Sequence, residues 1–163
     1  MKIFLRVSAI SAIVLGAVFV VAGIWGISFT HTNVAREKIV TTDDSSIPGV
    51  PVRGPLTLKA QADVIRHHVL TTTGDKTFAE MPRQIQKVDA NGKSVLDSEG
   101  KPVMVSNTAR DLWITATTLI TALNFAIFVY VFSGFVVIFG LLLIWAGFVI
   151  FIVNKKLHPS NQI

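Results

Sequence analysis

Two long apolar runs, one near each end of the chain, constrain this sequence more than any other feature. Residues 7–29 contain no charged side chain, and residues 112–153 form a second uncharged run of 42 residues. A helix needs about 20 apolar residues to cross the hydrocarbon core of a bilayer, so each run is long enough to span it. The sequence therefore predicts an integral membrane protein whose aqueous part is the middle segment, residues 30–111.

Charge is distributed unevenly between the tails and the middle segment. All ten acidic residues lie in the middle segment, whereas the two tails contain four cations and no acid: Lys2, Arg6, Lys155 and Lys156. By the positive-inside rule, both tails (1–6 and 154–163) are expected in the cytoplasm of a multi-pass protein of the cell (inner) membrane. The middle segment is then extracytoplasmic. Its nearly balanced charge argues against nucleic acid as a partner, and the chain has no Cys that could form a disulfide or a thiolate metal site.

Small residues recur every seven positions in both apolar runs. They are Ala9, Gly16 and Gly23 in the first run, and Ser133, Gly140 and Gly147 in the second. Small residues at this spacing let two membrane helices approach closely. The pattern predicts an antiparallel helical hairpin packed through these six positions. The alternative is the ordinary enrichment of Gly and Ala in membrane helices.

The second run is too long for a single bilayer crossing. As one helix its 42 residues would extend about 63 Å. Either one helix over 112–153 continues outside the bilayer, with its membrane part near 128–153, or two spans meet at a turn near Ser133–Gly134. We favour the single long helix, because Ser-Gly between two phenylalanines is a weak turn signal and the first half of the run is the more polar.

The same helix has a second stripe, made of phenylalanines at alternating spacings of three and four. Its members are Phe125, Phe128, Phe132, Phe135 and Phe139. Residues with this spacing share one face of a helix. We interpret the face as a docking surface for a partner or an isoprenoid-like lipid, with plain exposure to bilayer lipid as the alternative.

The middle segment has the pattern of a small α+β region. Residues 30–55 are rich in turn residues and are expected to be irregular, whereas 57–72 have helical periodicity that ends before Gly74. Thr77 and Glu80 resemble a capping box that opens a short turn of helix. A repeat of period eight over residues 89–103, with an Asn-Gly turn signal, predicts a β-hairpin or meander.

No constellation of residues in the sequence indicates catalysis. Asp63 and His67 have the i, i+4 spacing of two metal ligands, but a third ligand is missing nearby, and adjacent His67 and His68 point in different directions. The repeat does not match a calcium loop, and the spans contain no acid, base or His at mid-depth, as an ion path would need. We therefore expect no enzyme activity, no metal, no cofactor and no small-molecule substrate.

The chain resembles a family of small two-span membrane proteins from actinobacteria. The residues that carry the resemblance are 54–65 (GPLTLKAQADVI), 74–81 (GDKTFAEM) and Arg110, together with the glycine-containing spans. Relative to that pattern, the repeat over 89–103 looks like an insertion. Some members are called aromatic ring-cleaving dioxygenases, but a non-haem iron centre of two His and a carboxylate cannot be assembled from this sequence. The resemblance implies an accessory subunit of a larger envelope assembly, for example the actinobacterial supercomplex of a cytochrome bc complex and a cytochrome oxidase.

Together these features predict a mainly α membrane protein with two transmembrane helices in an antiparallel hairpin, at 7–29 and within 112–153, and a small extracytoplasmic α+β segment at 30–111. The leading hypothesis is a non-catalytic structural subunit of a multi-protein electron-transport complex, whose partners are other integral membrane subunits and membrane lipids. The second hypothesis is a free-standing envelope sensor or ligand-binding protein. The third, a membrane enzyme, would require a metal that Asp63 and His67 help to bind.

Overall fold

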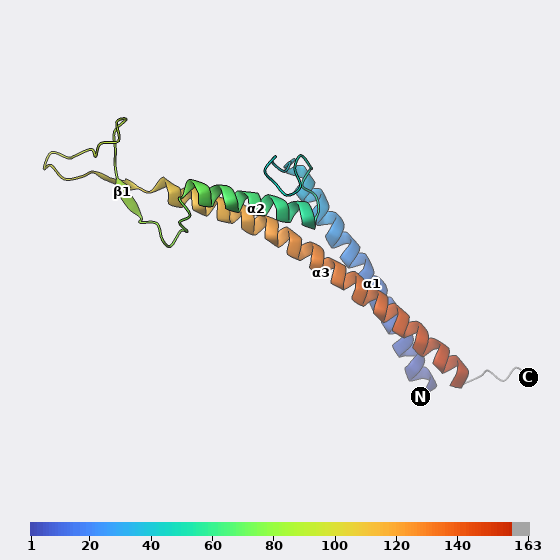
Figure 1. The fold of residues 1–163 in the computed structure, drawn as a ribbon. Helices are drawn as coiled ribbons and strands as arrows, with labels where there is room; N and C mark the ends of the chain where they lie inside the picture. The colour runs from blue at the N-terminus through green and yellow to red at the C-terminus, as the bar shows by residue number, and fades with distance from the viewer. Residues whose placement is uncertain (158–163) are drawn as a thin grey trace, which may run out of the picture. The chain divides into compact units, whose positions relative to one another are not determined.

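The computed structural model describes residues 1–157 and is mainly helical (Figure 1). The elements follow one another as α1 (Lys2–Arg36), α2 (Pro55–Thr72), β1 (Gln84–Gln86), β2 (Met104–Ser106) and α3 (Thr108–Leu157). Two of them, α1 and α3, are long and apolar enough to cross a membrane. The predicted C-terminal tail is described only as far as residue 157, and its residues 158–163 lie outside the described part.

The chain divides into two compact units. Unit 1 contains α1, the segment Pro51–Pro55 and α3 from Phe125 onward, whereas unit 2 contains Val40–Val50 and Leu56–Asn124. α3 is therefore shared, with its first part in unit 2 and its second part in unit 1. A single helix covers the whole second apolar run without a turn at Ser133–Gly134.

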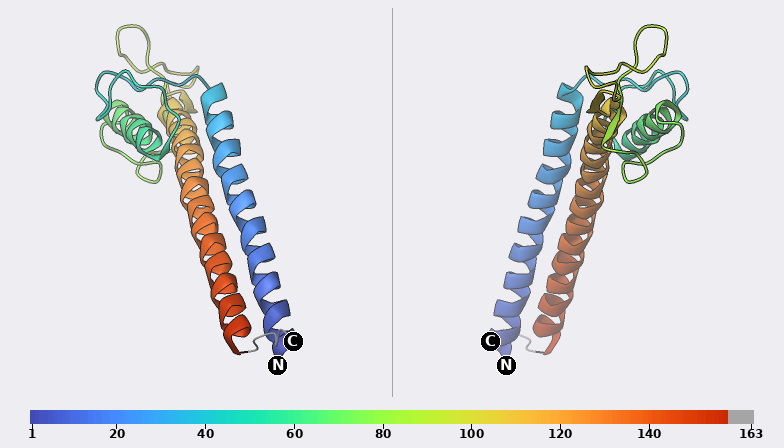
Figure 2. Two further views of the ribbon diagram at one scale, coloured as in Figure 1. Left: turned by 90° about the vertical axis from the view of Figure 1, so that its right-hand side faces the viewer. Right: turned by 90° about the vertical axis from the view of Figure 1, so that its left-hand side faces the viewer.

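In unit 1, α1 lies beside the second part of α3 in both views of Figure 2. α1 continues seven residues beyond the run that predicted it, so the expectation of irregular chain from residue 30 was wrong for 30–36. The polar side chains there are compatible with a helix, because the Thr30 hydroxyl and the Asn33 amide donate to the carbonyls of Gly26 and Phe29. The chain leaves the helical path at Lys38, where φ is +52°.

A tyrosine on α3 holds the short segment Pro51–Pro55 in unit 1. The Tyr130 hydroxyl donates to the carbonyl of Arg53, and the backbone N–H of Val52 donates to Ile39 at 2.9 Å. These bonds fix the short segment within unit 1 through residues far apart in the sequence.

Unit 2 is organised around α2 and the first turns of α3. Its core consists of Val69 from α2, Met81 from the following segment, and Trp113 and Ala116 from α3. The predicted helix over 57–72 is present and begins at Pro55, because proline suits the first turn of a helix, where its missing N–H costs nothing. It ends just before Gly74, whose φ of +63° is favourable for glycine.

The predicted capping box at Thr77 and Glu80 forms in part, with one hydrogen-bonded turn and no helix directly after it. Residues 77–80 make a single hydrogen-bonded turn, and the Glu80 carboxylate accepts bonds from both the backbone N–H and the hydroxyl of Thr77, each at 2.7 Å. In a capping box the threonine hydroxyl would instead bond the backbone of the third helical residue. The helix is not propagated, because Pro82 follows within one turn.

The repeat forms a small β arm, as predicted, with a more elaborate topology. β1 and β2 pair antiparallel, with Ile85 opposite Val105. Two further bridges pair Val88 with Ser94 and Leu96 with Pro102. The three paired arms meet where the N–H groups of three residues donate in a closed ring, from Lys87 to Val103, from Val95 to Lys87, and from Val103 to Val95. The eight-residue period of the sequence thus produces a three-way junction of short hairpins.

Candidate functional site

The closest contact in unit 1 runs along the stripe of small residues. Ala9, Gly16 and Gly23 of α1 are buried, and so are Ser133, Gly140 and Gly147 of α3. A Cβ built at Gly16 would lie 2.5 Å from the Gly140 carbonyl oxygen, and one at Gly147 would lie 2.8 Å from the Ala9 carbonyl oxygen. Real Cβ atoms do not come this close to backbone, so the two helices approach to a distance that only glycine permits at these positions.

Two polar residues, which the small-residue pattern did not include, extend this stripe. Thr30 lies seven residues after Gly23, and Asn154 lies seven residues after Gly147; both are buried. The Thr30 hydroxyl is bonded within its own helix. The Asn154 Oδ1 atom is buried and accepts no hydrogen bond from the part of the chain that the structure describes. The seven-residue spacing itself was the signal that could have identified both.

The phenylalanine stripe lies on the face of α3 next to the helix contact. All five rings are more than half exposed: Phe125, Phe128, Phe132, Phe135 and Phe139. Phe128 stacks on both Phe125 and Phe132, with ring centroids 6.2 Å and 6.0 Å apart. The stripe is thus a continuous apolar surface built from one face of one helix.

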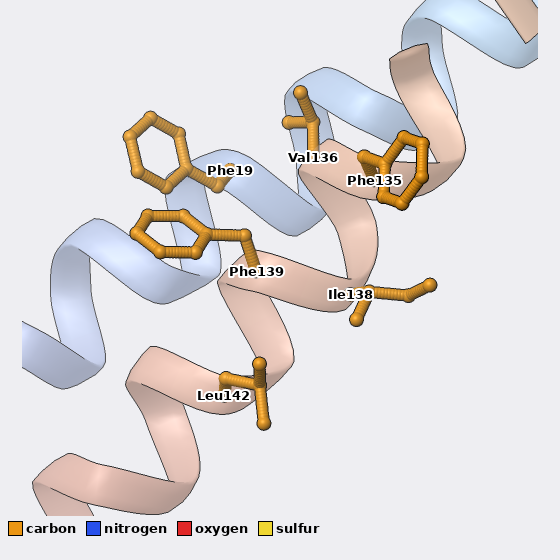
Figure 3. Close-up of a pocket in the computed structure, with 6 residues that line it drawn as sticks. All are labelled: Phe19, Phe135, Val136, Ile138, Phe139 and Leu142. Atoms are coloured by element: carbon orange, nitrogen blue, oxygen red, sulfur yellow. The ribbon is translucent and has the colours of Figure 1, made fainter. Parts of the chain in front are cut away.

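A shallow apolar groove of about 420 Å³ lies at the end of this stripe. Figure 3 shows the ring of Phe19 from α1 beside that of Phe139, whereas Phe135, Ile138 and Leu142 project from α3. The centroids of the Phe19 and Phe139 rings are 5.8 Å apart. The groove therefore joins the phenylalanine stripe to α1 and is lined by hydrocarbon side chains.

The candidate metal ligands of α2 are engaged with different partners. Asp63 forms an ion pair with Lys59 one turn away, and His68 bonds Asp44 at 2.6 Å through its Nε2 atom. Hydrogen bonds from the side chains of Thr42 and His68 lower the pKa of Asp44. Asp63 and His67 are not brought together with a third ligand, and residues 1–157 contain no group of three His, Cys, Asp or Glu side chains placed to hold a metal.

Arg110, at the start of α3, organises the segment that precedes the β arm. Its guanidinium lies 3.7 Å from the centroid of the Phe78 ring, and its Nη1 atom donates to the carbonyls of Phe78 and Met81. Asn107 caps α3 by accepting from the N–H of Ala109, while its amide donates to Pro82. A shallow hollow of about 380 Å³ lies beside these groups, and its lining is mixed, with Arg83 among the polar residues and Phe78 and Ile114 among the apolar ones.

Two acidic residues of the repeat serve the backbone. The Asp89 carboxylate accepts from the N–H groups of Asn91 and Lys93, and the Asp97 carboxylate makes the same pair of bonds with Glu99 and Lys101, all at 2.9 Å. Each turn places a glycine at positive φ, +77° at residue 92 and +79° at residue 100. These carboxylates therefore stabilise the two turns.

Comparison of the chain with protein-family models, with curated proteins and with solved structures finds no match in any of the three.

Proposed function

We propose that α1 and α3 cross the inner membrane as an antiparallel hairpin, with both termini in the cytoplasm and unit 2 on the extracytoplasmic side. The contacts of Gly16 with Gly140 and of Gly147 with Ala9 support this arrangement, because residue numbers rise along one helix as they fall along the other. The outward faces are apolar, with Trp25 and Trp145 each about two-thirds exposed. Such surfaces are stable in contact with lipid and costly in water.

We further propose that the protein is a non-catalytic accessory subunit of a multi-protein membrane complex. The observation that carries this proposal is the separation of roles on α3. Its small residues are in contact with α1, whereas its five phenylalanines are more than half exposed on the neighbouring face, where only Phe139 meets a ring of α1. A stacked aromatic surface of this kind suits packing against a neighbouring membrane subunit or a bound lipid.

The resemblance to small actinobacterial membrane proteins fits this role, and the respiratory supercomplex is the assembly we would test first. The residues that carry the resemblance contribute to the packing of unit 2. Residues 74–81 include Phe78 and Met81, whose carbonyls Arg110 holds, and residues 54–65 form most of α2. In this proposal these residues have a packing role in unit 2 and no catalytic role.

Recovery of the native complex tests the proposal. A tagged chain should co-purify with stoichiometric membrane subunits after extraction in a mild detergent. Phe132→Ala should weaken that association, whereas Phe148→Ala should not, because Phe148 lies on the opposite side of α3 although it is similarly exposed, 54% against 58%. Recovery of the chain alone would contradict the accessory role.

The hollow of mixed lining beside Arg83 and Arg110 favours one second candidate, an envelope sensor that binds a small ligand through unit 2. Expression of residues 40–124 separates the two. The fragment must continue past residue 111, since Trp113 and Ala116 belong to the core of this unit. A dispersed amide NMR spectrum that changes when a small ligand is added would favour the sensor. A collapsed amide spectrum, typical of an unfolded fragment, would favour the subunit.

A further inference from the structure

Cations from both long helices gather at one end of unit 1. Lys2 and Arg6 lie at the start of α1, and Lys155 and Lys156 lie in the last turn of α3, all four with exposed side chains. The contact of Gly147 with Ala9 brings these two helix ends together.

The seven-residue spacing of the contact places Arg6 close to the cations of α3. Arg6 precedes Ile13 by seven residues, and the side chain of Ile13 meets the position of a Cβ on Gly147 at 2.6 Å. Asn154 follows Gly147 by seven residues and is buried. Arg6 therefore continues the face of α1 that packs against α3, opposite Asn154 and beside Lys155. Lys2 lies one turn from Arg6 on the same side.

No acidic group of this chain's spans or tails compensates these charges. Residues 1–36 and 112–163 contain no Asp or Glu, and none of the three ion pairs among the described residues involves the four cations. Like charges held together at the edge of a low-dielectric region attract an anion strongly. Ile10 and Phe151 lie one turn deeper in the spans than Arg6 and Lys155, and their side chains are 48% and 43% exposed. A ligand with an anionic group and apolar chains therefore fits this end of the helix pair.

We propose that this end of the helix pair binds the headgroup phosphate of an anionic phospholipid, whose acyl chains extend into the bilayer over Ile10 and Phe151. The phosphate lies between Arg6 and Lys155, and Lys2 and Lys156 complete the basic surface. This inference rests on the proposed function, in that α1 and α3 must span the bilayer for the four cations to lie at headgroup level. It goes beyond the positive-inside rule, which concerns orientation and requires no bound lipid.

Lipid selectivity of the full-length protein tests the proposal. The protein is reconstituted into phosphatidylcholine vesicles, and its association with spin-labelled phosphatidylglycerol is compared with that of spin-labelled phosphatidylcholine. We expect a several-fold preference for phosphatidylglycerol. In the double variant Arg6→Gln/Lys155→Gln this several-fold preference should fall to almost none, since each of the two cations contributes up to about fivefold near a membrane surface.

A matched variant controls for net charge. Lys76→Gln/Lys93→Gln removes the same two charges from exposed positions in unit 2 and should keep the preference. Equal association of both lipids with the unmodified protein, or an unchanged preference in the Arg6/Lys155 variant, would overturn the lipid site. Equal losses in both variants would also overturn it, because the effect would then be that of net charge.

Two further measurements distinguish a lipid headgroup from free phosphate and test separately whether the protein is inserted in the membrane. Inorganic phosphate should displace the spin-labelled lipid no better than chloride at equal ionic strength, and stronger displacement would assign the cations to free phosphate and overturn the lipid site. Extraction of the protein from the vesicles by alkaline carbonate would overturn both the lipid site and membrane insertion. Retention without lipid preference would overturn the lipid site alone.

Discussion

Gly134 and Gly140 lie six residues apart on α3, but only one of them touches another helix. A Cβ at Gly140 would meet the Gly16 carbonyl oxygen at 2.7 Å and the Val20 nitrogen at 2.9 Å, whereas nothing lies within 4 Å of one at Gly134. A glycine-to-alanine substitution at each site therefore separates the effect of helix propensity on stability from the effect of the contact between helices.

We predict opposite effects of alanine at these two glycines. Gly140→Ala should destabilise the helix pair by about 1–3 kcal/mol, since backbone must move to admit the methyl group. Gly134→Ala should be neutral or stabilise the protein by up to about 1 kcal/mol, because alanine is the better helix former. Thermal unfolding of the full-length protein in detergent, followed by circular dichroism, measures both. Equal melting temperatures would mean that the stripe is only compositional.

At the residue scale as well, the contacts of Glu80 lower the pKa of its carboxyl group. Hydrogen bonds from the backbone N–H and then from the hydroxyl of Thr77 hold the pKa of the Glu80 carboxyl below its ordinary value of 4.5. A lowered pKa in the folded state stabilises the turn above pH 4.5, and this contribution disappears as the pH falls through the folded-state pKa.

We expect a carboxyl NMR titration to give Glu80 a midpoint below 4.5. Thr77→Val removes the hydroxyl but keeps the backbone donor, so the midpoint should rise part of the way towards the ordinary value. Thr77→Ser keeps both donors and should leave it lowered. A midpoint for Thr77→Val equal to that of the unmodified protein would mean that the hydroxyl plays no part.

Among the elements, the β arm shows how a repeat in sequence becomes a repeat in structure. The residue pairs Asp89/Gly92 and Asp97/Gly100 build two identical turns, each with a carboxylate bonded to two backbone N–H groups and a glycine at positive φ. The ring of three backbone bonds then joins them to the β1–β2 pair. Each turn is local, so its stability depends on its own aspartate.

Asp97→Ala should therefore loosen one turn and leave the other intact. Loss of its two bonds, each worth about 1 kcal/mol, should accelerate amide hydrogen exchange at Glu99 and Lys101 by roughly tenfold. Asp97→Asn retains a side-chain oxygen acceptor and should change exchange much less. Equal acceleration at Asn91 and Lys93, in the turn of Asp89, would show that the two turns unfold together.

Elements with a strong local period were predictable from the sequence, and their outer boundaries were less so. The helix in the middle segment and the single helix over the second apolar run both follow from periodicity and length. The continuation of α1 to Arg36 did not, because Thr30 and Asn33 resemble turn residues until their side chains bond carbonyls of the preceding turn. The three-way junction was missed because its third arm, β1 with β2, does not repeat the Asp-x-x-Gly turn.

For the whole molecule, the contacts that the sequence could not reveal are those between distant residues. Tyr130 bonds Arg53 across 77 positions, and His68 bonds Asp44 across 24. Neither pair has a periodicity or motif that links its members. The small-residue stripe is the exception, because two helices with the same spacing of glycines carry their complementarity in the sequence itself.

The orientation of the molecule in the membrane is the remaining prediction. The chain has no Cys, so single cysteines introduced at Ser98, in an exposed turn of the β arm, and at Ser160, in the C-terminal tail, report on the two sides without background. If α1 and α3 each cross once, a membrane-impermeant maleimide should label Ser98→Cys in intact cells, whereas Ser160→Cys should react only after permeabilisation. Because α3 is one continuous helix, a membrane-inserted α3 would carry the chain across the bilayer once, and we expect the basic tails at its end and before α1 both to remain in the cytoplasm. Ready labelling of Ser160→Cys in intact cells would place the tail outside and refute the two-span topology.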